Sequence, residues 1–285
     1  MVRRRTLTPV FRVQIPVAQF TRQRLSYLFD FDEEGDIVNS FISWIGGKKL
    51  LRKAILEQFP EQGTFDRYIE VFGGAGWILF SKESHAKMEV YNDVNNELVN
   101  LFRVVKYHPE ALQKELDWIL MSREEFFKAI QPARGLTDIQ RAARFFIAIK
   151  ESFGTDCHSF GVRPKNMQNA IIFLRRASDR LRNVVIENVD FERLIKTYDR
   201  PTSLFYLDPP YYGAENYYVG GFNAHTRLRD ILGQIHGSFV LSYNDCVEIR
   251  NLYKDFEIIE LQRAHNLTAV GGGGKKYKEL IIKNF

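Results

Sequence analysis

Short apolar runs alternate with stretches of helical periodicity in the first part of the chain. RYIEVF (residues 67–72) has the length and residue types of a short buried strand, and it ends in FGGAG (72–76). WILFSKE (77–83) is predicted to be the helix after that turn. MEVYN (88–92) is predicted to be a second strand and NNELVNLFRVVK (95–106) its helix. A strand, a glycine turn, a helix and a strand in this order are typical of the start of a parallel α/β sheet.

The alternation stops between about residues 107 and 182. TDIQRAARFFIAIKESF (137–153) opens with a capping box, Thr137 with Gln140 three residues on, and is predicted to be a helix. Few strand-like runs occur in this stretch, and arginines, lysines and phenylalanines are interleaved in its second half. We therefore predict a small, mostly helical insertion.

Strand-like runs return after residue 182, and the last two are expected to form an antiparallel pair. The predicted α/β domain consists of residues 40–106 and 183–285, interrupted by the insertion at 107–182. Residues 1–39, basic and then acidic, are predicted to be a poorly ordered extension. The later predicted strands lie in NVVIENVDF (183–191), SLFYLDPP (203–210), GSFVLSYND (237–245), FEIIEL (256–261) and KELIIKNF (278–285).

Composition narrows the class of protein. The 285 residues, 45% of them hydrophobic, are enough for one large domain with a substantial core, and the net charge of +5 permits an anionic partner without requiring one. The two cysteines, Cys157 and Cys246, lie in no metal-ligand cluster, so we expect neither a metal site nor a disulfide framework. This cysteine usage fits a protein of the reducing cytoplasm. No apolar run is long enough for a membrane span, and the basic N-terminus has no signal-peptide core.

Two sequence features indicate a nucleotide-like ligand at the end of the predicted sheet. FGGAG follows a strand and opens the next element, where glycines let the backbone approach a ligand closely. It lacks the pyrophosphate-binding patterns, so a nucleoside suits it better, although tight packing would explain it nearly as well. Asp93, where the second strand ends, could accept hydrogen bonds from ribose hydroxyls, or equally could cap the following helix.

The strongest single signal is DPPYY (208–212) directly after the apolar run LFYL. Asp208 is expected at the carboxyl end of a parallel strand, where open sheets bind their ligands. Pro209 and Pro210 would fix the direction of the carboxylate and the neighbouring carbonyls, and Tyr211 would offer a flat ring for stacking. This combination suits a planar base with an exocyclic amine; the alternative is a turn with a surface tyrosine.

Four motifs in a fixed order resemble the Dam-type family of DNA adenine-N6 methyltransferases, the alpha-ordered D12 class. They are FISWIGGKKLL (41–51), EVFGGAG (70–76), YNDVN (91–95) and DPPYY, and the resemblance covers most of residues 40–285. It implies a Rossmann-like sheet with an antiparallel last strand that binds S-adenosylmethionine, the methyl donor, without a metal. The insertion would then be the target-recognition region.

The resemblance also implies roles for individual residues. Asp208 and the Pro209 carbonyl would accept hydrogen bonds from the target amine, and Tyr211 would stack on the extruded adenine. Asp93 would hold the ribose hydroxyls, while Asp190 and Phe191 of NVDF would contact the adenine ring of the cofactor. The remaining cofactor residues would be Trp44, Lys48, Phe72, Gly73, Gly74, Gly76 and again Asp208.

The expected activity is direct methyl transfer to adenine N6 in double-stranded DNA, with the target base flipped out of the duplex. The alternatives are another amine as substrate, cytosine N4 or an RNA adenine, and a catalytically inactive DNA-binding protein of the same fold. A cognate restriction endonuclease is a candidate partner, and a cytoplasmic monomer of a prokaryotic cell or phage is expected. ESFGTDCHSFGVRPKN (151–166) differs from the hairpin with which Dam-type enzymes read GATC, so GATC specificity is not implied.

Overall fold

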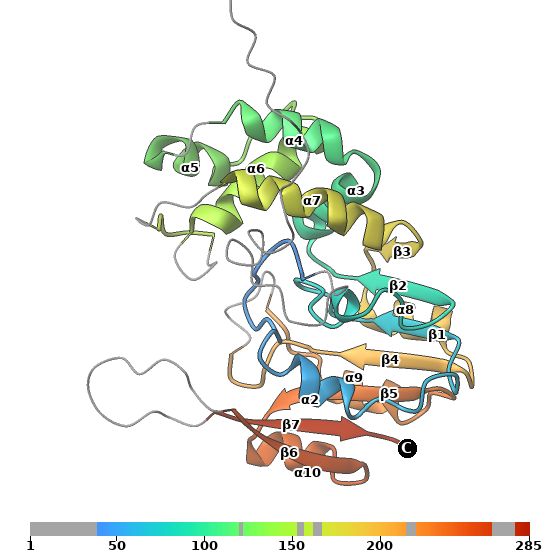
Figure 1. Cartoon of the computed structure of the whole chain (residues 1–285). Coiled ribbons are helices and arrows are strands. Elements are labelled where there is room, and N and C mark those ends of the chain that lie inside the picture. The colour runs from blue at the N-terminus through green and yellow to red at the C-terminus, as the bar shows by residue number, and fades with distance from the viewer. Residues whose placement is uncertain (1–38, 120–121, 153–156, 162–166, 215–220, 264–276) are drawn as a thin grey trace, which may run out of the picture. The chain divides into compact units, whose positions relative to one another are not determined.

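A mixed sheet of seven strands lies at the centre of the described part of the chain (Figure 1). The described residues of this computed structural model all belong to one compact unit, Val38–Phe285. The predicted N-terminal extension (1–39) lies outside the described residues apart from Asn39. The structure describes residues 39–119, 122–152, 157–161, 167–214, 221–263 and 277–285.

The strands follow the order β3-β2-β1-β4-β5-β7-β6 across the sheet. Strands β1 to β5 pair in parallel, whereas β7 runs antiparallel to both of its neighbours, β5 and β6. The predicted parallel sheet with an antiparallel last strand is therefore confirmed. The strands are β1 Arg67–Glu70, β2 Met88–Asn92, β3 Val184–Glu187, β4 Ser203–Leu207, β5 Ser238–Asn244, β6 Glu257–Arg263 and β7 Tyr277–Lys283.

Helices pack against both faces of the sheet, and each face has its own hydrophobic cluster. In β4, Leu204 and Tyr206 belong to one cluster while Phe205 and Leu207 belong to the other, because successive side chains of a strand point to opposite faces. Burial on both faces accounts for the unbroken apolar run before Asp208. The α-helices are α2 Arg52–Leu56, α3 Asn96–Tyr107, α4 Pro109–Asp117, α5 Arg123–Ile130, α6 Asp138–Glu151, α7 Met167–Leu181, α8 Phe191–Tyr198, α9 His225–Leu232 and α10 Val247–Leu252.

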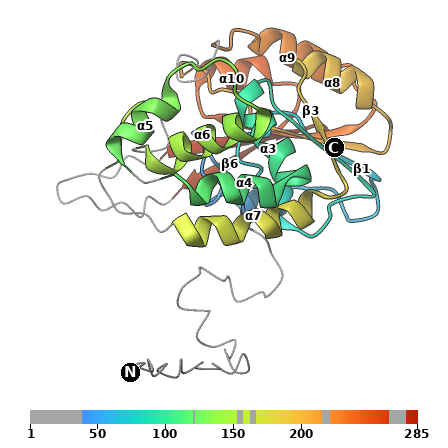
Figure 2. The ribbon, with the colours of Figure 1, turned by 90° about the horizontal axis from the view of Figure 1, so that it is seen from above.

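Helices α3 to α7 gather at the β3 end of the sheet (Figures 1 and 2). The capping box of α6 is present, with Gln140 N donating to Thr137 Oγ1 at 3.2 Å and Thr137 N donating to Gln140 Oε1 at 3.1 Å. Buried residues of α3, α4, α6 and α7 share one cluster with the first face of the sheet. These four helices therefore share a core with the sheet in the part of the chain that the structure describes.

The predicted helix at 77–83 is wrong. Only Leu79–Ser81 form regular structure there, a single turn of 3₁₀ helix called η1. Residues 77–81 are all buried, so this segment has no polar face to expose. The carbonyls of Leu79 and Lys82 instead accept hydrogen bonds from the side chain of Arg180.

Candidate active site

A cavity of about 230 Å³ lies at the carboxyl ends of β1, β2 and β4. This is where open parallel sheets place their ligands. Residues that follow each of the three strands line it: Phe72 after β1, Asp93 after β2 and Asp208 after β4. Of the residues predicted from sequence, those in the wall are Trp44, Lys48, Phe72, Gly73, Gly74, Asp93 and Asp208.

The glycine turn after β1 is shaped by both backbone conformation and close packing. Gly74 has a φ of +50°, a conformation that other residues rarely adopt. A Cβ on Gly73 would lie 2.2 Å from the Tyr91 ring, so any side chain there would collide with β2. The Tyr91 hydroxyl also donates to the Gly74 carbonyl at 2.7 Å. Tight packing therefore requires Gly73, while the left-handed turn requires Gly74.

Asp93 ties the end of β2 to this turn. Its Oδ2 accepts from Gly74 N at 2.9 Å, and its Oδ1 accepts from Asn95 N at 2.8 Å. Burial raises the pKa of Asp93, and the backbone N–H donors offset part of the rise. The residue that caps α3 is Asn95, not Asp93. Asp93 is thus held in the cavity wall with a carboxylate that can still accept further bonds.

Asp208 forms a buried ion pair with Lys48. The Lys48 ammonium donates to Asp208 Oδ2 at 2.7 Å and lies 2.6 Å from Oδ1. Oδ1 is buried and has no aligned hydrogen bond to the described residues. Burial lowers the pKa of Lys48, but Asp208 and other nearby acidic groups raise it by more, so the ammonium keeps its proton. Burial raises the pKa of Asp208, and Lys48 counteracts this rise.

The rest of the DPPYY turn is fixed from two sides. Lys48 Nζ lies 4.8 Å from the centre of the Tyr211 ring, at cation–π distance. The amide side chain of Asn244, at the end of β5, accepts from Tyr212 N at 3.1 Å and donates to Tyr212 O at 3.0 Å. Pro209 is buried, and neither it nor Tyr211 belongs to the cavity wall, although Pro210 does.

Asp190, Phe191 and Gly76 also lie outside the cavity wall. Asp190 caps α8 by accepting from Glu192 N, and its half-exposed carboxylate pairs with Arg227 at 3.0 Å. Phe191 is buried, with its ring 5.8 Å from that of Phe72. The contact of Asp190 and Phe191 with the cofactor therefore stays a prediction.

Several wall residues were not identified from the sequence. Glu70, the last residue of β1, faces the cavity, and burial raises its pKa to about 8 although Tyr68 Oη and Leu79 N both donate to it. Others come from the loop after the glycine turn, from the helical layer and from the segment before α9; they include Trp77, Ile78, Phe145, Cys157, His158, Gly221 and Phe222. Glu70 is the first residue of the EVFGGAG motif, which could have indicated its place in the site, but the other residues belong to none of the four motifs.

No group of three or more His, Cys, Asp and Glu side chains in the described part of the chain is arranged to hold a metal ion. No helix there combines the length and hydropathy of a membrane span.

Comparison with known proteins gives consistent matches over most of the chain. A family model described as D12 class N6 adenine-specific DNA methyltransferase matches residues 44–267. The chain is 27% identical to Type II methyltransferase M1.LlaDCHI of Lactococcus lactis subsp. cremoris, over 86% of this chain and 95% of that protein. It is 29% identical to Type II methyltransferase M.MjaIII of Methanocaldococcus jannaschii, over 61% and 69%. It is 24% identical to the DNA adenine methylase of Haemophilus influenzae, over 79% and 86%.

Proposed function

The chain belongs to the D12 class N6 adenine-specific DNA methyltransferases, and from this premise we propose that it methylates adenine N6 at a specific site in double-stranded DNA. S-adenosylmethionine would be the methyl donor, and the target base would leave the duplex, because N6 cannot be reached inside it. The observation that carries the proposal is the position of Asp208. It stands in the wall of a cavity that also contains Asp93 and the glycine turn.

The residues of the cavity fit the chemistry of S-adenosylmethionine, which supplies an electrophilic methyl group on a sulfonium. Trp44, Phe72 and Phe222 provide aromatic surface for an adenine ring. Asp93 is fixed by two backbone N–H groups and keeps acceptor capacity for ribose hydroxyls. The Asp208 carboxylate offers negative charge to a cationic ligand. Phe191 would support the adenine site from behind, through Phe72.

Asp208 would bind the target amine through Oδ1, the oxygen that has no aligned hydrogen bond among the described residues. The N6 lone pair of adenine is delocalised into the ring, so N6 is a weak nucleophile. Two acceptors on its hydrogens, Asp208 Oδ1 and the Pro209 carbonyl, favour a pyramidal nitrogen with its lone pair directed at the methyl carbon. Their negative character stabilises the positive charge that develops on N6 during transfer.

Lys48 and Tyr211 would complete this site. Lys48 holds Asp208 in place through Oδ2 and lies over the Tyr211 ring, so the carboxylate and the stacking platform share one anchor. Tyr211 would stack on the flipped base. Positioning of donor and amine in line supplies most of the remaining rate enhancement.

The helical residues 107–182 would contact the DNA and select the site. Their arginines and lysines would meet phosphates, and His158 and Cys157 bring this region to the edge of the cavity. We expect the enzyme to act as a monomer in the cytoplasm of a prokaryotic cell, with a cognate restriction endonuclease as a candidate partner.

Transfer of labelled methyl groups tests the proposal. The purified protein is incubated with unmethylated DNA and S-adenosylmethionine labelled in the methyl group, and the DNA is then digested to nucleosides. Label in N6-methyl-2′-deoxyadenosine supports the proposal, whereas label in N4-methyl-2′-deoxycytidine would show that the substrate is another amine. DNA binding without any label would identify an inactive binding protein.

A further inference from the structure

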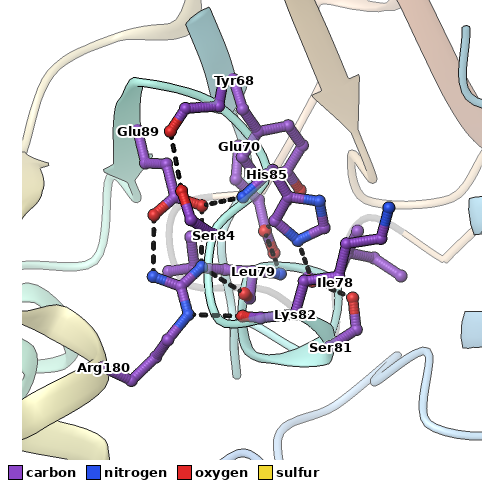
Figure 3. Close-up of polar contacts among 11 residues, drawn as sticks. Tyr68, Glu70, Ile78, Leu79, Ser81, Lys82, Ser84, His85, Glu89 and Arg180 are labelled. Carbon is purple, nitrogen blue, oxygen red and sulfur yellow. Dashed lines mark hydrogen bonds and ion pairs between the residues drawn. The ribbon is translucent and has the colours of Figure 1, made fainter. Parts of the chain in front are cut away.

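A buried polar network joins α7, in the helical layer, to the loop between the glycine turn and β2 (Figure 3). Its centre is an ion pair between Arg180, near the end of α7, and Glu89 of β2. The side chains are 4% and 5% exposed. The guanidinium donates to Glu89 Oε2 at 2.8 Å and to Oε1 at 2.7 Å, so the pair is bidentate.

The same guanidinium holds the loop directly. Arg180 Nε donates to the carbonyl of Lys82, and Nη2 donates to the carbonyl of Leu79, both at 2.7 Å (Figure 3). The loop contains only the single turn η1, so these carbonyls lack the partners that a longer helix would give them. One side chain from a distant helix therefore replaces the hydrogen bonds that the loop cannot make for itself.

The loop in turn forms part of the cavity wall. Trp77 and Ile78, at its start, line the cavity. Leu79 accepts from Arg180 through its carbonyl and donates through its N–H to Glu70 Oε2 at 2.8 Å, and Glu70 also lines the cavity. A single residue, Leu79, thus separates the Arg180 guanidinium from a carboxyl group that faces the ligand.

A second connection runs through His85. Its backbone N–H donates to Glu89 Oε1 at 2.8 Å, and its Nε2 lies 2.8 Å from the Ile78 carbonyl. Because a carbonyl can only accept, Nε2 carries the hydrogen. The ring stacks on Tyr68 with 4.4 Å between centres, and the Tyr68 hydroxyl donates to Glu70 at 2.8 Å. Both connections therefore lead from the Arg180–Glu89 pair to the cavity wall.

We propose that Arg180 is a positioning residue for the methyl-donor site: it holds the loop that places Trp77, Ile78 and Glu70 in the cavity wall. This inference rests on the proposed function, since it assigns a role in binding S-adenosylmethionine. Arginine is required because four hydrogen bonds leave the guanidinium in fixed directions. A lysine would keep the charge and the attraction to Glu89, but its compact ammonium has only three donors and cannot span Glu89 and both carbonyls.

Arg180→Lys tests the proposal, with Arg200→Lys as the matched control. Arg200 lies between α8 and β4, is exposed, and also donates to two main-chain carbonyls, those of Thr197 and Asp199, but it lies outside the cavity wall. The dissociation constant for S-adenosylmethionine is measured by calorimetry, and KM for the donor and for DNA is measured with kcat. Arg180→Lys is expected to weaken donor binding about tenfold, as loss of one or two hydrogen bonds does. KM for DNA should stay within twofold, because the buried Arg180 side chain is not exposed to phosphates, and Arg200→Lys should resemble the wild type.

Three results would overturn the proposal. Unchanged donor affinity in folded Arg180→Lys would show that Arg180 does not position the site. The activity of Arg180→Lys could instead fall only in proportion to the fraction of protein that is unfolded. If the donor dissociation constant and KM of the folded protein were then unchanged, Arg180 would have a purely stabilising role. If the wild type fails to bind S-adenosylmethionine, both the proposed function and this inference are refuted. If the wild type binds it, the Arg180 variants test this inference alone.

A double variant covers the case in which Arg180→Lys does not fold. Arg180→Met with Glu89→Met removes both charges, so no unpaired charge stays buried, and it also removes the bonds to Leu79 and Lys82. Weakened donor binding in this folded variant supports the positioning role. Donor binding equal to that of the wild type refutes it.

Discussion

The two buried ion pairs near the cavity differ in how completely their hydrogen bonds are made. In the Arg180–Glu89 pair both side chains are about 5% exposed, and the bidentate contact is completed by two carbonyls and the His85 N–H. In the Lys48–Asp208 pair the cation is a single ammonium, Asp208 is 18% exposed, and Asp208 Oδ1 has no aligned bond to the described residues. Four of the five N–H groups of Arg180 are bonded and neither member of that pair lines the cavity, whereas Asp208 does.

This difference assigns a structural role to the Arg180–Glu89 pair and a proposed catalytic role to Asp208. The Arg180–Glu89 pair is buried and lies outside the cavity wall, so its contribution is to fix the elements that it joins. A carboxylate with a spare acceptor beside a cavity can bind an amine without breaking its anchor. The account therefore expects catalytic effects from changes at Asp208 and effects on stability and donor affinity from changes at Arg180.

Removal of the Asp208 carboxylate should give the largest effect. In Asp208→Ala the target amine would lose its proposed carboxylate acceptor, and we expect methyl transfer to fall by at least about 10²- to 10³-fold. Single-turnover transfer of labelled methyl groups measures the loss, and circular dichroism checks the fold. Transfer at the wild-type rate by a correctly folded variant would remove Asp208 from the mechanism.

Removal of the Arg180 guanidinium should mainly affect stability. Arg180→Met leaves Glu89 buried without a cation, and such a change typically costs about 3–5 kcal/mol of unfolding free energy. Urea unfolding measures it, and the double variant with Glu89→Met should recover a large part of the loss. Equal stability of the single and double variants would show that the charge of Glu89 is tolerated alone.

Glu70 is a third buried acidic group near the cavity, and its hydrogen-bond donors are the neutral Tyr68 hydroxyl and Leu79 N–H. Burial raises its pKa from about 4.5 to about 8, so between these values the folded protein holds a proton that the unfolded chain has lost. This contribution to stability is present at low pH and is lost as pH rises through 8. Glu70→Gln keeps acceptors for Tyr68 and Leu79 but has no proton to lose.

The stability of Glu70→Gln relative to the wild type should therefore increase with pH between about 5 and 8, by up to roughly 1.4 kcal/mol per pH unit. Urea unfolding of both proteins at pH 5.5, 6.5 and 7.5 provides the measurement. A constant difference across this range would show that Glu70 is already ionised in the folded protein.

A surface ion pair should give the smallest effect. Arg182 and Asp179 are both well exposed and three residues apart, so solvent and salt screen their attraction. Arg182→Ala is expected to leave the urea midpoint unchanged within error. A clear loss of stability would show that the end of α7 depends on more than the buried pair.

The sequence predicted the elements whose signals are local. Short apolar runs located the strands, and Thr137 with Gln140 marked the start of α6, because a capping box needs only four consecutive residues. The order of the motifs placed Asp93 and Asp208 at the same edge of the sheet, since parallel strands end there together.

Contacts between distant residues could not be predicted. Arg180 and Glu89 are 91 residues apart, and nothing in either segment indicates the partner. The failed helix at 77–83 has the same cause, because carbonyls that a local pattern assigns to a helix accept from Arg180 instead. Phe145 and Phe222 likewise reach the cavity through the packing of helices and loops far from the motifs.

The proposed methylation of adenine N6 can be tested directly on unmethylated genomic DNA. The purified protein is incubated with this DNA and S-adenosylmethionine, and the product is sequenced by a method that reads modified bases, with Asp208→Ala in parallel. The account predicts N6-methyladenine at one short motif with the wild type and almost none with the variant. Binding of S-adenosylmethionine without any modified adenine, or equal modification by both proteins, would contradict it.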